Sequence, residues 1–150
     1  MKPFRLAIAL FLASPYAGLH GETIDLLRED WSSALAAAEE KGAHLYVAFI
    51  GEGWSVASDR FSSNILETGT FRDFARSNLV YCPVRARRSP KLAKDEIARL
   101  QSLVIHFDIK SYPTFLLIAP DGSEVLRHAY RPDSAEDYVD LLKAILPPAS

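Results

Sequence analysis

The feature that most constrains the fold is an almost uninterrupted apolar run at residues 44–50, with the sequence HLYVAFI. A strand with one face in water alternates apolar and polar residues, whereas a strand covered on both faces shows no such alternation. The run is also shorter than an ordinary buried helix. It therefore predicts a central β-strand with helices packed on both of its faces.

The rest of the chain alternates helical and extended patterns around this strand. Helices are predicted at 31–41, 57–66, 70–77 and 92–107, and a last helix opens with the capping box of Ser134 and Asp137. Strands are predicted at 79–84, 114–119 and 124–129, with a basic loop at 85–89. Strands joined through helices pair in parallel, while the turn at 120–122 closes an antiparallel hairpin. This order predicts one α/β domain with a mixed sheet of four or five strands and helices on both faces.

The first 21 residues indicate an export signal rather than a part of this domain. Lys2 and Arg5 precede the apolar stretch LAIALFLA at residues 6–13, and small, turn-forming residues follow it. The stretch is too short to span a bilayer, which favours a cleaved signal over an anchor. Cleavage is expected between Ala17 and Gly21. The mature domain would then start near residue 22 in an oxidising compartment, either the periplasm or the extracellular space.

Charge and composition exclude several classes of function. Lys and Arg total 17 against 19 Asp and Glu, whereas nucleic-acid binders carry a basic excess. Removal of Lys2 and Arg5 with the signal makes the mature chain more acidic still, so no nucleic-acid partner is expected. The four histidines show no metal-ligand spacing, and a single cysteine forms neither an internal disulfide nor a site of several thiolates. No metal or cofactor is expected, and after signal cleavage no membrane contact is expected.

The order of the elements, with Trp54 after the first strand and Tyr112-Pro113-Thr114 before the third, resembles the thioredoxin fold. More narrowly, it is similar to the thioredoxin-like domains of exported bacterial proteins. In these domains a strand leads into a G-x-x-W-C-x-x-C turn and then a helix, and the stretch here is GEGWSVAS at 51–58. The resemblance covers about residues 31–146. It implies a cis peptide bond at Pro113, in a loop that faces the turn.

One departure from the family pattern bears directly on function. Ser55 and Ser58 stand where the family has its two cysteines. Ala48 stands where many relatives carry an aspartate that helps to move protons at the buried thiol. A serine hydroxyl is a far weaker nucleophile than a thiolate and forms no mixed disulfide. These residues predict an exported thioredoxin-fold protein without dithiol redox activity.

Trp54, Tyr112 and Pro113 are the predicted binding residues. In the resembled fold, the backbone at the cis-proline pairs with an extended peptide much as an added strand would. The expected partner is therefore an extended polypeptide or another protein, and the expected role is that of a binding or chaperone-like module. The plainer alternative is that Trp54 covers a helix end and that Ser55 and Ser58 cap the helix.

Two further functions are open at the level of the sequence. Cys82, in the predicted strand 79–84, is either a small buried apolar residue or an exposed thiol that pairs with another chain or acts as a monothiol. The stretch at 53–57 also matches G-x-S-x-A, close to a nucleophile elbow, and Asp121 and His128 follow in the chain order of a hydrolase triad. The mature chain, about 130 residues, is too short for the hydrolase fold, which disfavours this interpretation.

Overall fold

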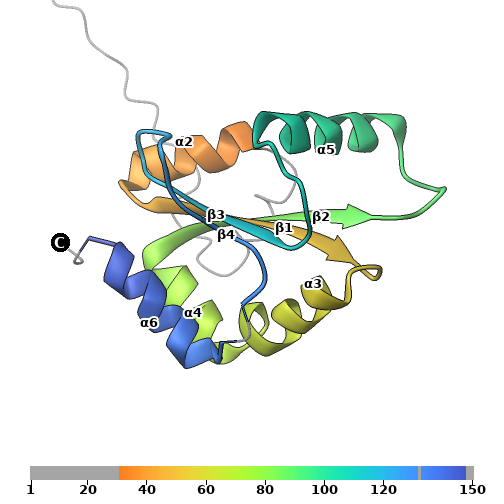
Figure 1. Ribbon diagram of the computed structural model, residues 1–150. Coiled ribbons are helices and arrows are strands. Elements are labelled where there is room, and N and C mark those ends of the chain that lie inside the picture. The colour runs from red at the N-terminus through yellow and green to blue at the C-terminus, as the bar shows by residue number, and fades with distance from the viewer. Residues whose placement is uncertain (1–30, 132, 148–150) are drawn as a thin grey trace, which may run out of the picture.

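The computed structural model describes residues 31–131 and 133–147 (Figure 1). The predicted export signal and its cleavage region lie outside the described residues. One mixed sheet has the strand order β2-β1-β3-β4. Its strands are β1 (His44–Glu52), β2 (Leu79–Arg87), β3 (Thr114–Ile118) and β4 (Glu124–His128).

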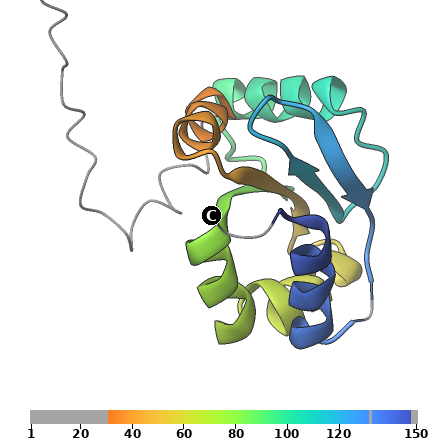
Figure 2. The same cartoon turned by 90° about the vertical axis from the view of Figure 1, so that its left-hand side faces the viewer.

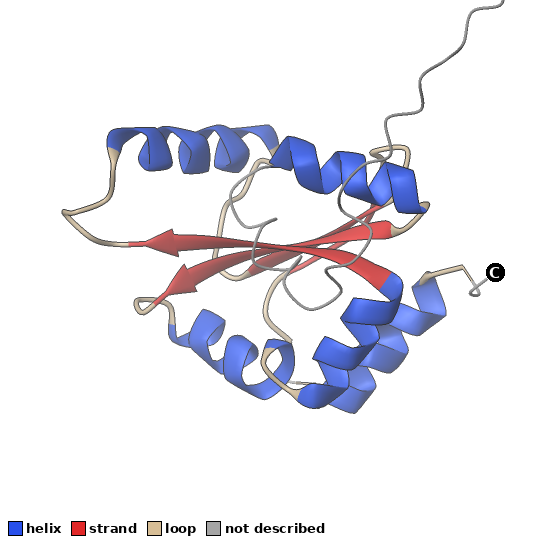
Figure 3. Ribbon diagram, turned by 180° about the vertical axis from the view of Figure 1, so that it is seen from behind, coloured by secondary structure: helices blue, strands red, loops and turns tan. Residues whose placement is uncertain are grey.

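Helices cover both faces of this sheet, as Figures 1 to 3 show. Helices α2 (Trp31–Lys41) and α5 (Lys94–His106) lie on one face. The other face carries α3 (Val56–Phe61), the π-helical turn η1 (Ser62–Leu66), α4 (Gly69–Asn78) and α6 (Ala135–Ile145). The predicted α/β architecture, with a mixed sheet between two helical layers, is confirmed.

The apolar run found in the sequence is the central strand β1. Its alternate side chains enter two separate cores, one containing Tyr46, Ala48 and Ile50 and the other containing Leu45, Val47 and Phe49. All six are buried. Full burial of a large apolar side chain contributes about 1.5–3 kcal/mol, so both faces of β1 stabilise the fold and neither accepts a polar residue cheaply.

The chain returns to the C-terminal end of β1 before it enters β3. Strands β1 and β2, joined through helices, are parallel as expected. Strand β3 also follows a helix, yet it pairs antiparallel with β1, with Phe49 opposite Thr114. The segment 107–113 carries the chain back over the sheet to the end where β1 stops (Figure 1). The end of β1, the start of α3 and this segment therefore meet at one edge of the domain.

Several element boundaries differ from the sequence prediction. Strand β2 continues through Arg87, so residues 85–87 belong to the sheet rather than to a basic loop, because β1 extends far enough to pair with them. The predicted helix 57–66 is α3 followed by η1, in which Ile65 and Leu66 both turn into the core. The Ser134 cap of α6 forms as expected, since its side chain accepts the N–H of Asp137.

Candidate functional site at the turn after β1

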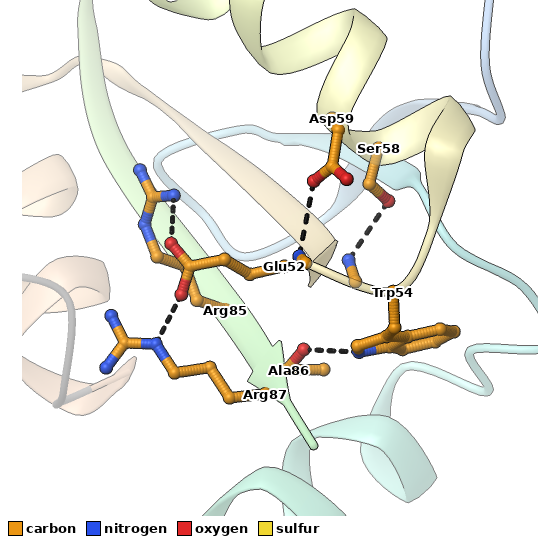
Figure 4. A network of polar contacts seen from close by, with 9 residues as sticks. Glu52, Trp54, Ser58, Asp59, Arg85, Ala86 and Arg87 are labelled. Atoms are coloured by element: carbon orange, nitrogen blue, oxygen red, sulfur yellow. Dashed lines mark hydrogen bonds and ion pairs between the residues drawn. The ribbon is translucent and has the colours of Figure 1, made fainter. Parts of the chain in front are cut away.

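Side-chain to backbone hydrogen bonds hold the turn that joins β1 to α3. Ser55 is the N-cap of α3, and its Oγ accepts the backbone N–H of Ser58 at 3.2 Å. The Oγ of Ser58 accepts the N–H of Gly51 at 3.0 Å, and the N–H of Gly53 donates to Asp59 Oδ1 at 3.3 Å (Figure 4). Ser55 thus has the capping role expected of it. Ser58 is not a cap but a buried residue that ties the turn back to β1.

Two glycines make this path of the backbone possible. A Cβ at Gly51 would lie only 2.8 Å from the Cβ of Ser55 and 2.8 Å from Cζ2 of Trp54. Gly53 has φ +74°, a left-handed conformation that costs glycine little and other residues more. The indole of Trp54 consequently lies directly against the backbone at the end of β1.

Trp54 is fixed by contacts outside its own helix. Its Nε1 donates to the carbonyl oxygen of Ala86 in β2 at 2.7 Å (Figure 4). Its ring meets the ring of Tyr112 edge to face, with 5.2 Å between the centroids. The half-buried indole therefore bridges the end of β2 and the segment before β3, which is a larger role than covering the end of α3.

The loop before β3 lies against the turn. The peptide bond between Tyr112 and Pro113 is cis, and the Ser55 hydroxyl donates to the carbonyl oxygen of Tyr112 at 3.3 Å. Within the described part of the chain, the backbone N–H of Tyr112 has no hydrogen-bond partner. Pro113 itself is buried and offers a partner little surface, whereas Tyr112 is partly exposed. Burial raises the pKa of the Tyr112 phenol, which stays neutral at physiological pH.

Charged side chains lie beside the turn, at the ends of β1 and β2. Glu52 accepts from Arg85 Nη1 at 2.9 Å and also binds Nε of Arg87 (Figure 4). Burial raises the pKa of Glu52, but the bonds and charges of the two arginines outweigh it and leave that pKa below its ordinary value. Glu52 is therefore ionised and joins the two strands.

Cys82 lies away from this turn. It is 2 % exposed and belongs to the core beneath α2 and α5, where its Cα pairs with that of Val47 in the middle of the sheet. Ala48 is fully buried in the opposite core. Because its side chain is a methyl group, it brings no carboxylate to the region under the turn. Of the alternatives open for Cys82, burial supports the small apolar residue over the exposed thiol.

The residues of the possible hydrolase triad do not assemble. Asp121 lies in the β3–β4 turn, near His44 at the start of β1, whereas Ser55 follows the end of β1. A strand of this length separates those two ends by roughly 25 Å. His128 Nε2 is held by the Tyr138 hydroxyl at 2.7 Å. The G-x-S-x-A match is therefore not a nucleophile elbow in this fold.

The described residues were also searched for a metal-binding group and for a membrane-spanning helix. Across 31–131 and 133–147, no group of three or more His, Cys, Asp or Glu side chains is placed to hold a metal ion. No helix within that part of the chain combines the length and the apolar character needed to cross a membrane.

Comparison with solved structures identifies the fold. The chain matches a DsbH oxidoreductase with a TM-score of 0.74 and 20 % identity, over 81 % of this chain and 84 % of that one. The chain has the thioredoxin fold. A thioredoxin from Thermus thermophilus matches with a TM-score of 0.58 and 18 % identity, over 77 % of this chain and 82 % of that one. The reduced C-terminal domain of Neisseria meningitidis DsbD matches with a TM-score of 0.57 and 12 % identity, over 77 % of this chain and 93 % of that one.

Sequence comparison also finds a similar protein. The chain is 20 % identical over 118 residues to the disulfide bond reductase DsbH of Chlamydia pneumoniae, which covers 79 % of this chain and 71 % of that protein. No protein-family model matches the chain. At these identities the likeness establishes the thioredoxin fold, and function depends on the residues of the site.

The fold brings Trp54, Ser55 and Tyr112 together as the sequence predicted, and it adds residues that sequence reasoning missed. Val56, beside the turn, is 66 % exposed although it is apolar. The guanidinium carbon of Arg88 lies 4.0 Å from the centroid of the Trp54 ring. Arg88 belongs to the predicted basic loop at 85–89, but no local pattern indicates its contact with Trp54, because that contact depends on how far β2 extends past the turn.

Proposed function

We propose that this protein is an exported member of the thioredoxin superfamily that binds an extended polypeptide at the turn after β1 and performs no dithiol exchange. The observation that carries this proposal is the 3.3 Å contact between the Ser55 hydroxyl and the Tyr112 carbonyl. A serine meets the cis-proline loop at the point where, in the family, the first cysteine of the turn would stand.

The side chains at this point do not support thiol chemistry. A reductase of this type needs one thiolate to attack a disulfide and a second thiol to resolve the intermediate. Ser55 caps α3, and Ser58 is buried and bound by the Gly51 N–H. The single cysteine is buried in the core on the other side of the sheet. The name of the curated relative, a disulfide bond reductase, is therefore not carried over to this chain.

The same site has the features that a polypeptide ligand requires. The unpartnered N–H of Tyr112 provides a donor, and its carbonyl oxygen has a second lone pair, so an extended backbone can pair there as in strand addition. Val56 is largely exposed, and Trp54 and Tyr112 are partly exposed. An apolar side chain of the partner would dock on these three residues while its backbone pairs with the loop.

A binding experiment with a matched pair of variants tests this role. The mature chain is immobilised and presented with a cysteine-free library of N-acetylated, C-amidated heptapeptides, and the retained fraction is measured by mass spectrometry. Val56→Ala should reduce retention several-fold. Val125→Ala makes the same truncation at a 43 % exposed residue of β4 and should not reduce it. Equal retention by the two variants, or no retention by the wild-type chain, would contradict the proposal.

A second experiment tests the loss of redox chemistry. The wild-type protein should not accelerate insulin reduction by dithiothreitol. The double variant Ser55→Cys, Ser58→Cys should close a disulfide in air, because the Ser55 side chain already lies against the backbone of Ser58, with its Oγ 3.2 Å from the Ser58 nitrogen. It should then gain weak activity. Wild-type turnover that disappears in Cys82→Ala would instead support the monothiol alternative.

A further inference from the structure

We propose that Arg88 makes the turn selective for polypeptides that carry an acidic side chain close to the apolar residue docked on Trp54. This inference rests on the proposed function and names the class of ligand. Its basis is the position of one unpaired guanidinium directly over the aromatic ring of the binding surface.

Arg88 is held at the site without using its hydrogen-bond donors on an oxygen. Its guanidinium carbon lies 4.0 Å from the centroid of the Trp54 ring, within the range of a cation–π contact. Trp54 is itself fixed by its bond to Ala86, so the ring gives the arginine a rigid platform. A guanidinium has five N–H donors in one plane, and two of them match the oxygens of a carboxylate.

The neighbouring charges leave Arg88 as the cation available to a ligand. Arg85 and Arg87 share Glu52, and Glu96 at the start of α5 adds a further negative charge near Arg87. Among the residues the structure describes, Arg88 is in no ion pair, and its side chain is exposed. Arg85 and Arg87 thus have carboxylates beside them, whereas Arg88, which lies over Trp54, is in no ion pair within the described part of the chain.

This arrangement is complementary to a carboxylate rather than to a bare apolar segment. The overall charge of the protein is −2, so the positive charge of Arg88 beside an aromatic surface is opposite in sign to the net charge of the molecule. A ligand that docks an apolar residue on Trp54 and Tyr112 brings its next side chains close to Arg88. A glutamate or aspartate there would complete the ion pair that Arg88 lacks.

The test compares pairs of heptapeptide sublibraries. The two members of a pair differ only at one fixed position, which carries Glu in one and Gln in the other. Successive pairs move this position along the peptide. Wild-type protein should retain the best Glu sublibrary about three- to five-fold more than its Gln counterpart, the size of a partly exposed ion pair. The preference should weaken in about 0.5 M NaCl because salt screens exposed charges. Arg88→Gln should abolish it. Lys94→Gln, which removes an exposed positive charge at the start of α5, should preserve it.

The outcomes separate this inference from the function on which it rests. Equal retention of the Glu and Gln sublibraries, with both clearly bound, overturns the selectivity and leaves the binding function intact. A preference that survives Arg88→Gln, or that Lys94→Gln also removes, overturns the role of Arg88. If neither sublibrary is retained by the wild-type chain, the proposed function fails and this inference fails with it.

Discussion

Replacement of Tyr138 by Phe should lower the free energy of unfolding far more than the same replacement of Tyr46. The two hydroxyl oxygens lie 2.7 Å apart in the core below the sheet, and Tyr138 also lies 2.7 Å from His128 Nε2. Both tyrosines are almost fully buried. Burial raises the pKa of both phenols, so each is a neutral O–H group that needs a partner.

The direction of this hydrogen-bond chain follows from its last member. His128 Nδ1 lies 2.6 Å from the carbonyl oxygen of Ala129. A carbonyl oxygen only accepts, so Nδ1 carries the proton and Nε2 of the neutral ring is the acceptor. Tyr138 must therefore donate to His128, and Tyr46 must donate to Tyr138.

This direction sets the size of the two effects. Tyr138→Phe removes two hydrogen bonds and leaves the buried Tyr46 O–H without an acceptor, which together cost about 2–4 kcal/mol. Tyr46→Phe removes one bond and leaves the bond from Tyr138 to His128 in place, which costs about 1 kcal/mol. Both changes keep the ring, so the packing against Phe61 and Phe71 is preserved.

Urea unfolding of the protein, followed by far-UV circular dichroism at a pH of about 7.5, measures these differences. At an unchanged slope, the Tyr138→Phe midpoint should fall by on the order of 1–2 M. Tyr130→Phe is the control, since that tyrosine is 36 % exposed, and it should stay within about 0.5 kcal/mol of wild type. An equal or larger loss in Tyr46→Phe than in Tyr138→Phe would refute the assigned direction of the chain.

Two more predictions concern pH and the turn. The pKa of His128 is lowered by burial, so the unfolded chain binds more protons near the ordinary histidine pKa of about 6.5. The free energy of unfolding should therefore decrease as the pH is lowered from about 8 to 5. His128→Gln should remove the His128 contribution to this pH dependence. The contribution of His44, whose pKa burial also lowers, should remain. In Gly51→Ala the new Cβ would overlap Trp54, so this variant should lose about 1–3 kcal/mol, shift the tryptophan emission and lose peptide retention. Gly69→Ala, where a Cβ meets nothing within 4 Å, is its control, and a Gly51→Ala protein with unchanged emission and peptide retention would contradict the close packing of the turn.

Local patterns in the sequence determined the elements that frame the site. The apolar run at 44–50 predicted a strand buried on both faces because the side chains of residues 45–50 alternate between one core and the other. Ser55 and Ser134 predicted helix starts because a hydroxyl before a helix satisfies its first free N–H groups. The order of these elements, with Trp54 and Tyr112-Pro113 at their places, resembles the thioredoxin fold, and that resemblance predicted Ser55 beside the loop at Pro113.

Only the tertiary structure decided which distant groups meet. The Ser55 to Tyr112 contact joins residues 57 positions apart, and the Tyr46 to Tyr138 bond joins residues 92 apart. The antiparallel direction of β3, the extension of β2 to Arg87 and the position of Arg88 over Trp54 likewise follow from strand pairing. Periodicity and capping depend on neighbours within one element, whereas these contacts depend on how the connecting segments place one element against another.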